Sequence, residues 1–218
     1  TGQSMTHDDF AWLSHRKIDL AGCQANVIRV SFAGEAGFEI HCQMDDVVAV
    51  YDAVMVAGAA HQLRPFGMLA LDSMRLEKGY RSWKSDLTSD YTMFDSGLGR
   101  WVNFNKDDFV GRAALQAEKQ AGSQGEFVTL TLDDPDDDAP FGEAVYLSNV
   151  SIDGVDAGLV VSAGYGHRVG ASIAMAVVDR QALAKAKDIS VLVLGRKRRA
   201  TVVKGHVLYD PENAKMKV

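Results

Sequence analysis

The feature that most constrains the fold is a change of hydrophobic pattern between Gly122 and Gly125. Before this point, alternating β-branched runs are mixed with apolar residues at helical spacing, and after it the chain contains short β-prone runs separated by turn residues. Strands mixed with helices are typical of an α+β domain, whereas repeated short strands are typical of a small β-barrel or sandwich. We therefore predict an α+β fold class, with an α+β domain over 1–122 followed by a small all-β domain over 123–218.

The first part has the pattern of a hairpin followed by helices. Gly34 and Gly37 flank a short link between two β-prone runs, which predicts a tight hairpin. The pair Asp45-Asp46 is expected to supply the N-cap of a first helix, and Pro65-Phe66 precedes a second apolar run at helical spacing. The predicted elements are strands at 26–32 and 38–42, and helices over 45–58, after 65–66 up to 79, and over 107–122.

The second part predicts six strands, at 127–132, 144–148, 159–162, 173–178, 189–194 and 200–203. The acidic run 133–138 lacks the glycine and the distal glutamate of a calcium loop, so we interpret it as a solvated turn. The basic run 196–199 follows Gly195 and predicts a solvated hairpin tip.

Charge and composition exclude several kinds of partner. The formal net charge of −6 argues against nucleic acid, because phosphate binding needs a clustered positive face. No apolar run reaches the ~18 residues of a membrane span, and no basic-then-apolar leader opens the sequence, so we expect no membrane partner and a cytoplasmic location. Cys23 and Cys42 are expected to be reduced, partly buried thiols.

Local patterns that suggest chemistry are weak here. The glycine-rich segment 164–170 resembles a nucleotide loop, but the next residues predict a strand where a dinucleotide site needs a helix. The six histidines lack metal-ligand spacing, so we expect no metal, and the sequence has no G-x-S-x-G nucleophile motif.

Three segments, taken together and in order, point to a known family. They are RVSFAGEAGFEI at 29–40, ALDSMRLEKGYRSWKSD at 70–86, and FVGRAAL at 109–115 preceded by Lys106. In order and spacing they resemble the folate-binding glycine-cleavage T-protein (aminomethyltransferase) family. The residue pattern of the second segment and the ending LYDP at 208–211 resemble those of the family branch found behind the flavin domains of dimethylglycine and sarcosine dehydrogenases.

This resemblance implies a role in one-carbon metabolism. The family binds tetrahydrofolate and loads a one-carbon unit onto it, which gives 5,10-methylenetetrahydrofolate. T-proteins take the unit from an aminomethyl group on a lipoyl carrier protein, and the dehydrogenase-linked modules take it from the product of amine oxidation. The implied partners are folate and either an upstream flavin domain or a lipoyl carrier, with FAD only in that upstream domain.

The resemblance also assigns folate-binding residues. Glu39 matches the family glutamate that holds the pteridine, and a carboxylate can accept two N–H donors from that ring edge; otherwise Glu39 is a strand residue facing water. Tyr80 matches an aromatic residue near the pterin, although a tyrosine packed at a helix end would look the same. Phe32 stands where T-proteins often have tyrosine and keeps only the packing role. Glu35 is expected mainly to hold the turn.

Two features of the second segment bear on activity. Leu71 stands where T-proteins carry an arginine used for folate, a departure that suits the dehydrogenase-linked branch better. Arg75 and Glu77 are expected to be buried or half-buried and therefore paired, because polar groups persist inside a protein only when they have partners.

No residue matches the acid–base aspartate of the family, which lies in an upstream half of the folate domain that we expect to be missing. The catalytic residue is therefore unassigned, and we expect the isolated chain to show no turnover. Three functions remain open: the folate module of a demethylating dehydrogenase, a fragment of a T-protein aminomethyltransferase, and a non-catalytic T-protein-like binding domain.

Overall fold

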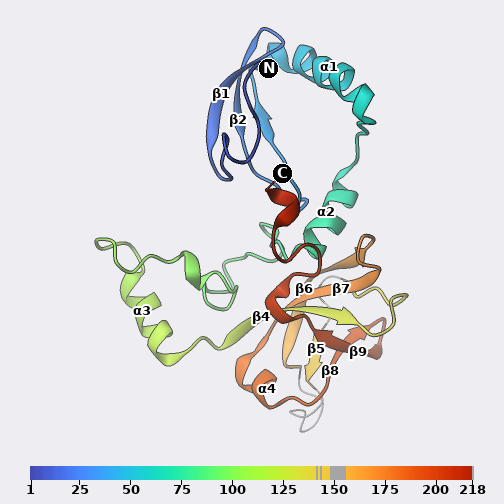
Figure 1. Cartoon of the computed structure of the whole chain (residues 1–218). Helices are drawn as coiled ribbons and strands as arrows, with labels where there is room; N and C mark the ends of the chain where they lie inside the picture. Colours follow the sequence, from blue (N-terminus) through green and yellow to red (C-terminus); the bar gives the residue numbers. More distant parts are fainter. Residues whose placement is uncertain (141, 143, 148–155, 218) are drawn as a thin grey trace. The chain divides into compact units, whose positions relative to one another are not determined.

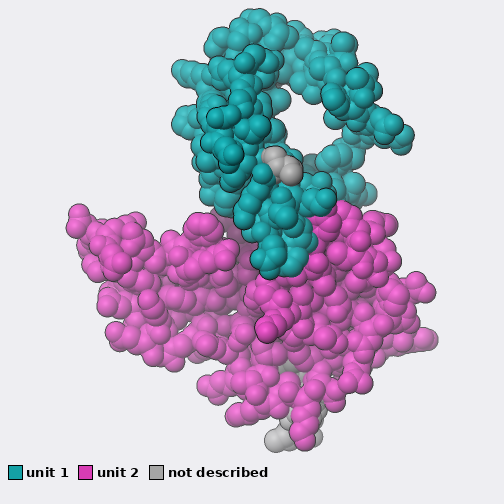
Figure 2. All heavy atoms as spheres, in the orientation of Figure 1, with its two compact units in different colours: residues 1–75, 210–218 teal, residues 76–209 magenta. Residues whose placement is uncertain are grey.

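The computed structural model describes residues 1–140, 142, 144–147 and 156–217. The chain forms two compact units, one made of residues 1–75 and 210–218 and the other of residues 76–209 (Figures 1 and 2). The first unit mixes strands and helices and the second contains a closed β-barrel, so the predicted fold class, α+β with a small β-barrel, is confirmed.

The first unit is built on a three-stranded antiparallel sheet of order β1-β2-β3 (Figure 1). Its strands are β1 (His15–Leu20), β2 (Cys23–Ile28) and β3 (Glu39–His41). Ile18 from β1 and Val27 from β2 pack with Phe10 in one small core cluster. The unit also contains α1 (Val47–Gly58), the 3₁₀ turns η1 (Met44–Asp46), η2 (Ala59–His61) and η5 (Ala214–Met216), and the first part of α2 (Met68–Glu77).

The helices of this unit confirm the sequence prediction, but the tight hairpin is wrong. β2 ends at Ile28, which pairs with Glu39, so the whole segment 29–38 is a loop. Beyond β2 the regular ladder breaks: the amide of Arg29 still donates to the carbonyl of Ser14, but the carbonyl of Arg29 accepts from the amide of Leu13, and the amide of Val30 turns back to the carbonyl of Ile28. Those contacts direct the backbone towards the residues before β1, which was itself not predicted.

The second unit contains a closed antiparallel barrel of order β4-β7-β6-β5-β8-β9 (Figure 1). Its strands are β4 (Gly125–Leu132), β5 (Ala144–Leu147), β6 (Gly158–Gly166), β7 (Ala171–Asp179), β8 (Ile189–Val193) and β9 (Arg196–Val202). The helices of the unit are α3 (Arg112–Ala121) and α4 (Arg180–Lys185), with the 3₁₀ turns η3 (Gly99–Trp101) and η4 (Lys204–His206).

The side chains along β7 alternate between two core clusters. Ala174, Ala176 and Val178 belong to the main cluster, whereas Ile173, Met175 and Val177 belong to a second cluster that includes Leu76 at the end of α2. Successive side chains point to opposite faces of a strand, so β7 packs on both sides of the sheet. This second cluster fixes the end of α2 on the barrel wall.

The six predicted strands are confirmed within the described residues. The predicted strand 144–148 is observed as β5 over 144–147, and position 148 lies outside the described residues. The basic run, however, lies in β9 and not at a hairpin tip, because Leu194 and Gly195 form the turn with φ of 47° and 77°. Arg198 pairs with Asp137, and Arg199 pairs with Asp133 and Asp188. Both cysteines are free and half-buried, as expected.

Candidate functional site

The edge strand β3 carries the first predicted folate residue, Glu39. This strand pairs with β2 alone, and the Glu39 side chain is 62% exposed. Its carboxylate lies 3.3 Å from Nε2 of His41, which is also largely exposed. Phe32, in the preceding loop, is 38% exposed. An exposed carboxylate and a partly exposed aromatic ring in the same unit can both meet a ligand from solution.

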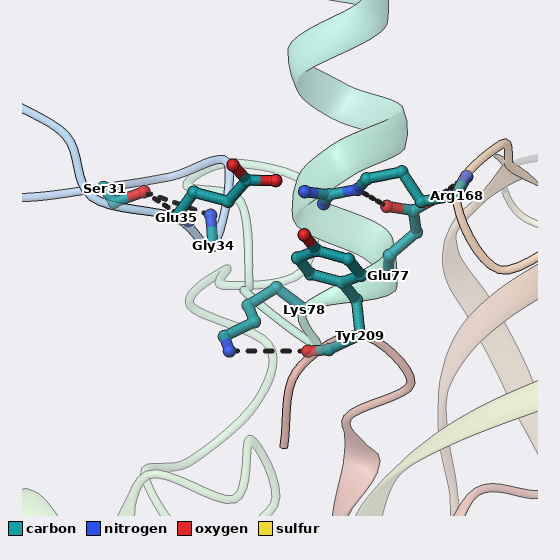
Figure 3. Close-up of polar contacts among 7 residues, drawn as sticks. All are labelled: Ser31, Gly34, Glu35, Glu77, Lys78, Arg168 and Tyr209. Carbon is teal, nitrogen blue, oxygen red and sulfur yellow. Dashed lines mark hydrogen bonds and ion pairs between the residues drawn. The ribbon is translucent and has the colours of Figure 1, made fainter. Parts of the chain in front are cut away.

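The loop before β3 is held by a serine. The Ser31 hydroxyl oxygen accepts hydrogen bonds from the amides of Gly34 and Glu35, at 3.1 and 3.2 Å (Figure 3). Gly34 has a φ of 81°, a conformation that glycine adopts without steric cost. The amide of Ala36 then donates to the carbonyl of Lys215 at 2.9 Å. Glu35 thus contributes to the turn through its backbone, as expected.

Arg29 anchors the base of this loop and was missed by the sequence analysis. It is buried, and its guanidinium donates to the carbonyls of Met5 at 2.6 Å and Met216 at 3.3 Å. The guanidinium also lies 5.4 Å from the centre of the Phe38 ring. The sequence signal that could have identified Arg29 is its place as a charged residue inside the β-branched run at 26–32, because a charge is buried only when its donors find acceptors.

In the second unit, the end of α2 is joined to the barrel by the buried Glu77. The Glu77 carboxylate accepts from the backbone amide of Arg168 at 2.6 Å and from Nε of the same arginine (Figure 3). Its carbonyl accepts from the amides of Leu208 and Tyr209. Lys78 donates to the carbonyl of Tyr209 at 3.4 Å. The predicted burial and pairing of Glu77 are confirmed, and so are those of Arg75, which binds Asp72 at 2.7 Å.

Gly79 and Tyr80 follow directly, and the barrel sets their position. Gly79 has a φ of 71°, and a Cβ added there would lie 2.3 Å from the carbonyl oxygen of His206. Tyr80 is half-buried. Glu77 and Gly79 are both held in place by these contacts. The backbone position from which the Tyr80 side chain extends is therefore defined within the second unit. Leu71, on α2, is half-buried and belongs to the first unit.

The structure therefore places Glu39 and Phe32 on the first unit and Tyr80 on the second. In the described part of the chain, no group of three or more His, Cys, Asp or Glu side chains could hold a metal ion. None of the described helices is long and apolar enough to cross a membrane.

Family comparisons identify both parts of the chain. The family model of the GCVT N-terminal domain matches residues 1–106, and that of the glycine cleavage T-protein C-terminal barrel domain matches residues 126–210.

Individual relatives agree with these matches. The chain is 29% identical to mitochondrial dimethylglycine dehydrogenase of Mus musculus over 99% of its own length and 24% of the relative. It is 37% identical to mitochondrial sarcosine dehydrogenase of Homo sapiens over 60% of its length and 14% of the relative. The glycine cleavage system aminomethyltransferase T from Bartonella henselae shares the fold, with a TM-score of 0.78 at 22% identity over 92% of this chain and 54% of that one. The chain thus spans about a quarter of the dehydrogenase and about half of the aminomethyltransferase.

Proposed function

The chain belongs to the glycine-cleavage T-protein family, and on that premise we propose that it is a tetrahydrofolate-binding module that helps to form 5,10-methylenetetrahydrofolate in a dimethylglycine or sarcosine dehydrogenase-like enzyme. The observation that carries this choice of branch is the match to dimethylglycine dehydrogenase over 99% of the chain. Leu71 adds support, because a leucine cannot hold a carboxylate or carbonyl as the arginine expected of T-proteins would.

The proposed folate contacts are Glu39, Phe32 and Tyr80. Glu39 suits the pterin edge because its carboxylate is exposed and, within the described residues, its polar contact is with another exposed side chain, His41, so little has to be broken before N–H donors bind. Phe32 offers a partly exposed aromatic ring, and Tyr80 offers a half-buried ring on the second unit. These residues can bind and orient a pterin. The group that moves a proton in the one-carbon transfer is not among them.

The domain assignment and partners follow from the same proposal. Residues 1–122 form the C-terminal part of the folate-binding domain and residues 123–218 the T-protein barrel domain, a division supported by the family matches to 1–106 and 126–210. The partner is an upstream flavin domain that holds FAD. For the compartment, a cytoplasmic location remains our expectation, although the dehydrogenase relatives are named as mitochondrial.

A second candidate is a fragment of an aminomethyltransferase that works with a lipoyl carrier, which is favoured by the shared fold with the Bartonella henselae protein. The sequence upstream in the gene separates the two candidates. A strand, a G-x-G-x-x-G loop and a helix a few hundred residues upstream support the dehydrogenase branch. The absence there of both this flavin unit and an acid–base aspartate would instead support a non-catalytic binding domain.

Glu39→Gln in the full-length protein tests the folate site. The substitution keeps the shape and replaces an acceptor oxygen with a donor, so it removes up to two hydrogen bonds of about 1.5–3 kcal/mol each. We expect tetrahydrofolate affinity to fall by about one to three orders of magnitude in calorimetry, at about 1.4 kcal/mol per tenfold change. The melting temperature should barely move, because the side chain is exposed.

Glu212→Gln is the matched control, since Glu212 is an exposed glutamate in the same unit. It should bind tetrahydrofolate as the unchanged protein does. Equal affinities for all three proteins would show that Glu39 is a surface strand residue and would remove the site assignment.

A further inference from the structure

The helix α1 of the first unit is apolar on every side and yet almost uncovered. Its sequence, VVAVYDAVMVAG, includes a single charged side chain, Asp52. Val50 is its one buried residue, and within the described residues the main contacts of α1 are with the short turns η1 and η2 at its two ends. A helix that is apolar all round is normally internal and packed on several sides. The helix α1 therefore has the composition of a buried helix and the surroundings of a surface helix.

The uncovered part forms a stripe on the side of α1 opposite Val50. Val48, Tyr51 and Met55 have the i, i+3, i+7 spacing that places side chains on one face of a helix. Val48 is 68% exposed and Tyr51 is 55% exposed, and Val56 beside them is 77% exposed. Figure 2 shows an opening in the first unit bordered by this helix. An exposed apolar surface of this kind marks a place where another surface binds.

The charged residues that border the stripe are acidic. Asp52 lies on the same face of the helix, Asp45 and Asp46 precede it, and the sequence has no lysine or arginine between Arg29 and Arg64. Helices that bind anionic lipid carry lysine and arginine on their polar face, so a membrane surface does not suit this one. A second copy of the chain would bring like charges together, which is unfavourable at a contact. The surface that suits this face is apolar and bordered by lysine or arginine.

The length of the relatives indicates where such a surface comes from. This chain covers 24% of the dimethylglycine dehydrogenase of Mus musculus and 54% of the Bartonella henselae aminomethyltransferase, so both relatives extend well beyond the matched region. A surface on the same polypeptide is present at an effective concentration of about millimolar, and one helix face is then enough to hold it. A tethered occupant also keeps the apolar stripe covered at every protein concentration.

We propose that α1 is an internal docking surface of the full-length protein. A part of the same polypeptide outside this chain covers Val48, Tyr51 and Met55 with apolar side chains and places a lysine or arginine against Asp52. The proposal rests on the proposed function in one respect, namely that the chain is a module of a longer, dehydrogenase-like enzyme. It adds the surface by which the module is joined to the rest of that enzyme, and none of the proposed folate contacts lies on α1.

Hydrogen exchange of the full-length protein, measured by mass spectrometry of its peptides, tests the docking with Val48→Asp. If α1 is covered, the new charge disrupts the apolar contact, and the peptides of α1 should exchange at least about tenfold faster than in the unchanged protein. If α1 is uncovered, the opposite is expected, because valine and aspartate have similar helix propensities and an acidic residue in the first turn stabilises a helix. The sign of the change therefore decides between the two.

Leu194→Asp is the matched control, since Leu194 is 83% exposed and lies in the turn between β8 and β9. It should leave the exchange of α1 unchanged. Asp52→Lys is the second variant and should also speed the exchange of α1, and Asp52→Asn should do so less, because only the lysine repels a facing cation. Slow exchange of β7 in the same experiment shows that each variant is folded.

The proposal is overturned if α1 exchanges no faster in Val48→Asp and Asp52→Lys than in the unchanged protein. Protection of α1 that rises with protein concentration would make a second copy the occupant, and protection that appears only with vesicles of anionic lipid would make it a membrane; either result overturns the proposal. The exchange is measured without tetrahydrofolate, so failure of the folate proposal in the calorimetry of Glu39→Gln would leave this result unaffected.

Discussion

At the residue scale, Gly79 shows how one backbone position ties α2 to the barrel. Its φ of 71° and the carbonyl oxygen of His206, 2.3 Å from where a Cβ would lie, exclude any side chain. Gly79→Ala therefore adds a clash with a backbone atom, costing about 1–3 kcal/mol, to the conformational cost of about 1–2 kcal/mol. We expect chemical denaturation to show the sum as a loss of unfolding free energy.

Gly195→Ala separates these two contributions. Gly195 has a similar φ of 77°, but nothing lies within 4 Å of a Cβ placed there. This variant should lose only the conformational cost of about 1–2 kcal/mol. Equal losses in the two variants would mean that the contact between Gly79 and His206 contributes nothing to specifying glycine.

At the scale of the elements, the sequence identified those whose pattern is local. The strands of the barrel were predicted because each is a β-prone run between turn residues, and α1 because valines recur at helical spacing. β1 was missed because Ile18 and Leu20 are its only large apolar residues. The predicted strand at 200–203 began too far along the chain, because the basic residues at the start of β9 were interpreted as a solvated tip. They form ion pairs with Asp133, Asp137 and Asp188, and no pattern within β9 reveals those partners.

In the candidate site too, the local features could be predicted from the sequence, whereas the long-range partners could not. The burial of Arg75 and Glu77 was predicted from their place in the second motif segment, and the structure confirms it. The partner of Glu77 could not, because Arg168 lies 91 residues further along the chain. Arg29 likewise takes acceptors from Met5 and Met216, near opposite ends of the sequence.

The ion pair between Glu77 and Arg168 links α2 to the turn joining β6 to β7. Both side chains are shielded from water, with exposures of 1% and 21%. Breaking such a pair leaves a buried charge and costs about 3–5 kcal/mol. We expect Glu77→Gln and Arg168→Gln each to destabilise strongly in urea denaturation, and the double variant to lose much less than the sum.

Arg180 and Glu126 form the matched exposed pair in the same unit, with exposures of 53% and 45%. The same double-mutant cycle should give a coupling of about 0–1 kcal/mol there. A coupling between Glu77 and Arg168 no larger than this would contradict their role as the link.

At the scale of the whole molecule, the two units differ in how much apolar surface each buries for itself. Among the described residues, the barrel encloses a core cluster supplied by β4, β6, β7, β8 and β9, including Leu130, Ala174 and Val191. In the first unit, α1 buries only Val50, while Val48 and Val56 are 68% and 77% exposed. Burial of apolar area is the dominant favourable contribution to folding, so the second unit holds most of the chain's intrinsic stability.

Amide hydrogen exchange of the whole chain should reveal this difference directly. Segments with few buried contacts open at low free energy, whereas core strands open only with global unfolding. We expect β7, which is buried along almost its entire length, to exchange slowest, and α1 to exchange early. The helix α3 is the control, because it lies in the second unit and buries none of its residues. If α3 exchanges as early as α1, then burial, and not membership of a unit, sets the exchange rate. If α1 is instead protected as strongly as β7, the exposed valines of α1 must be covered in solution.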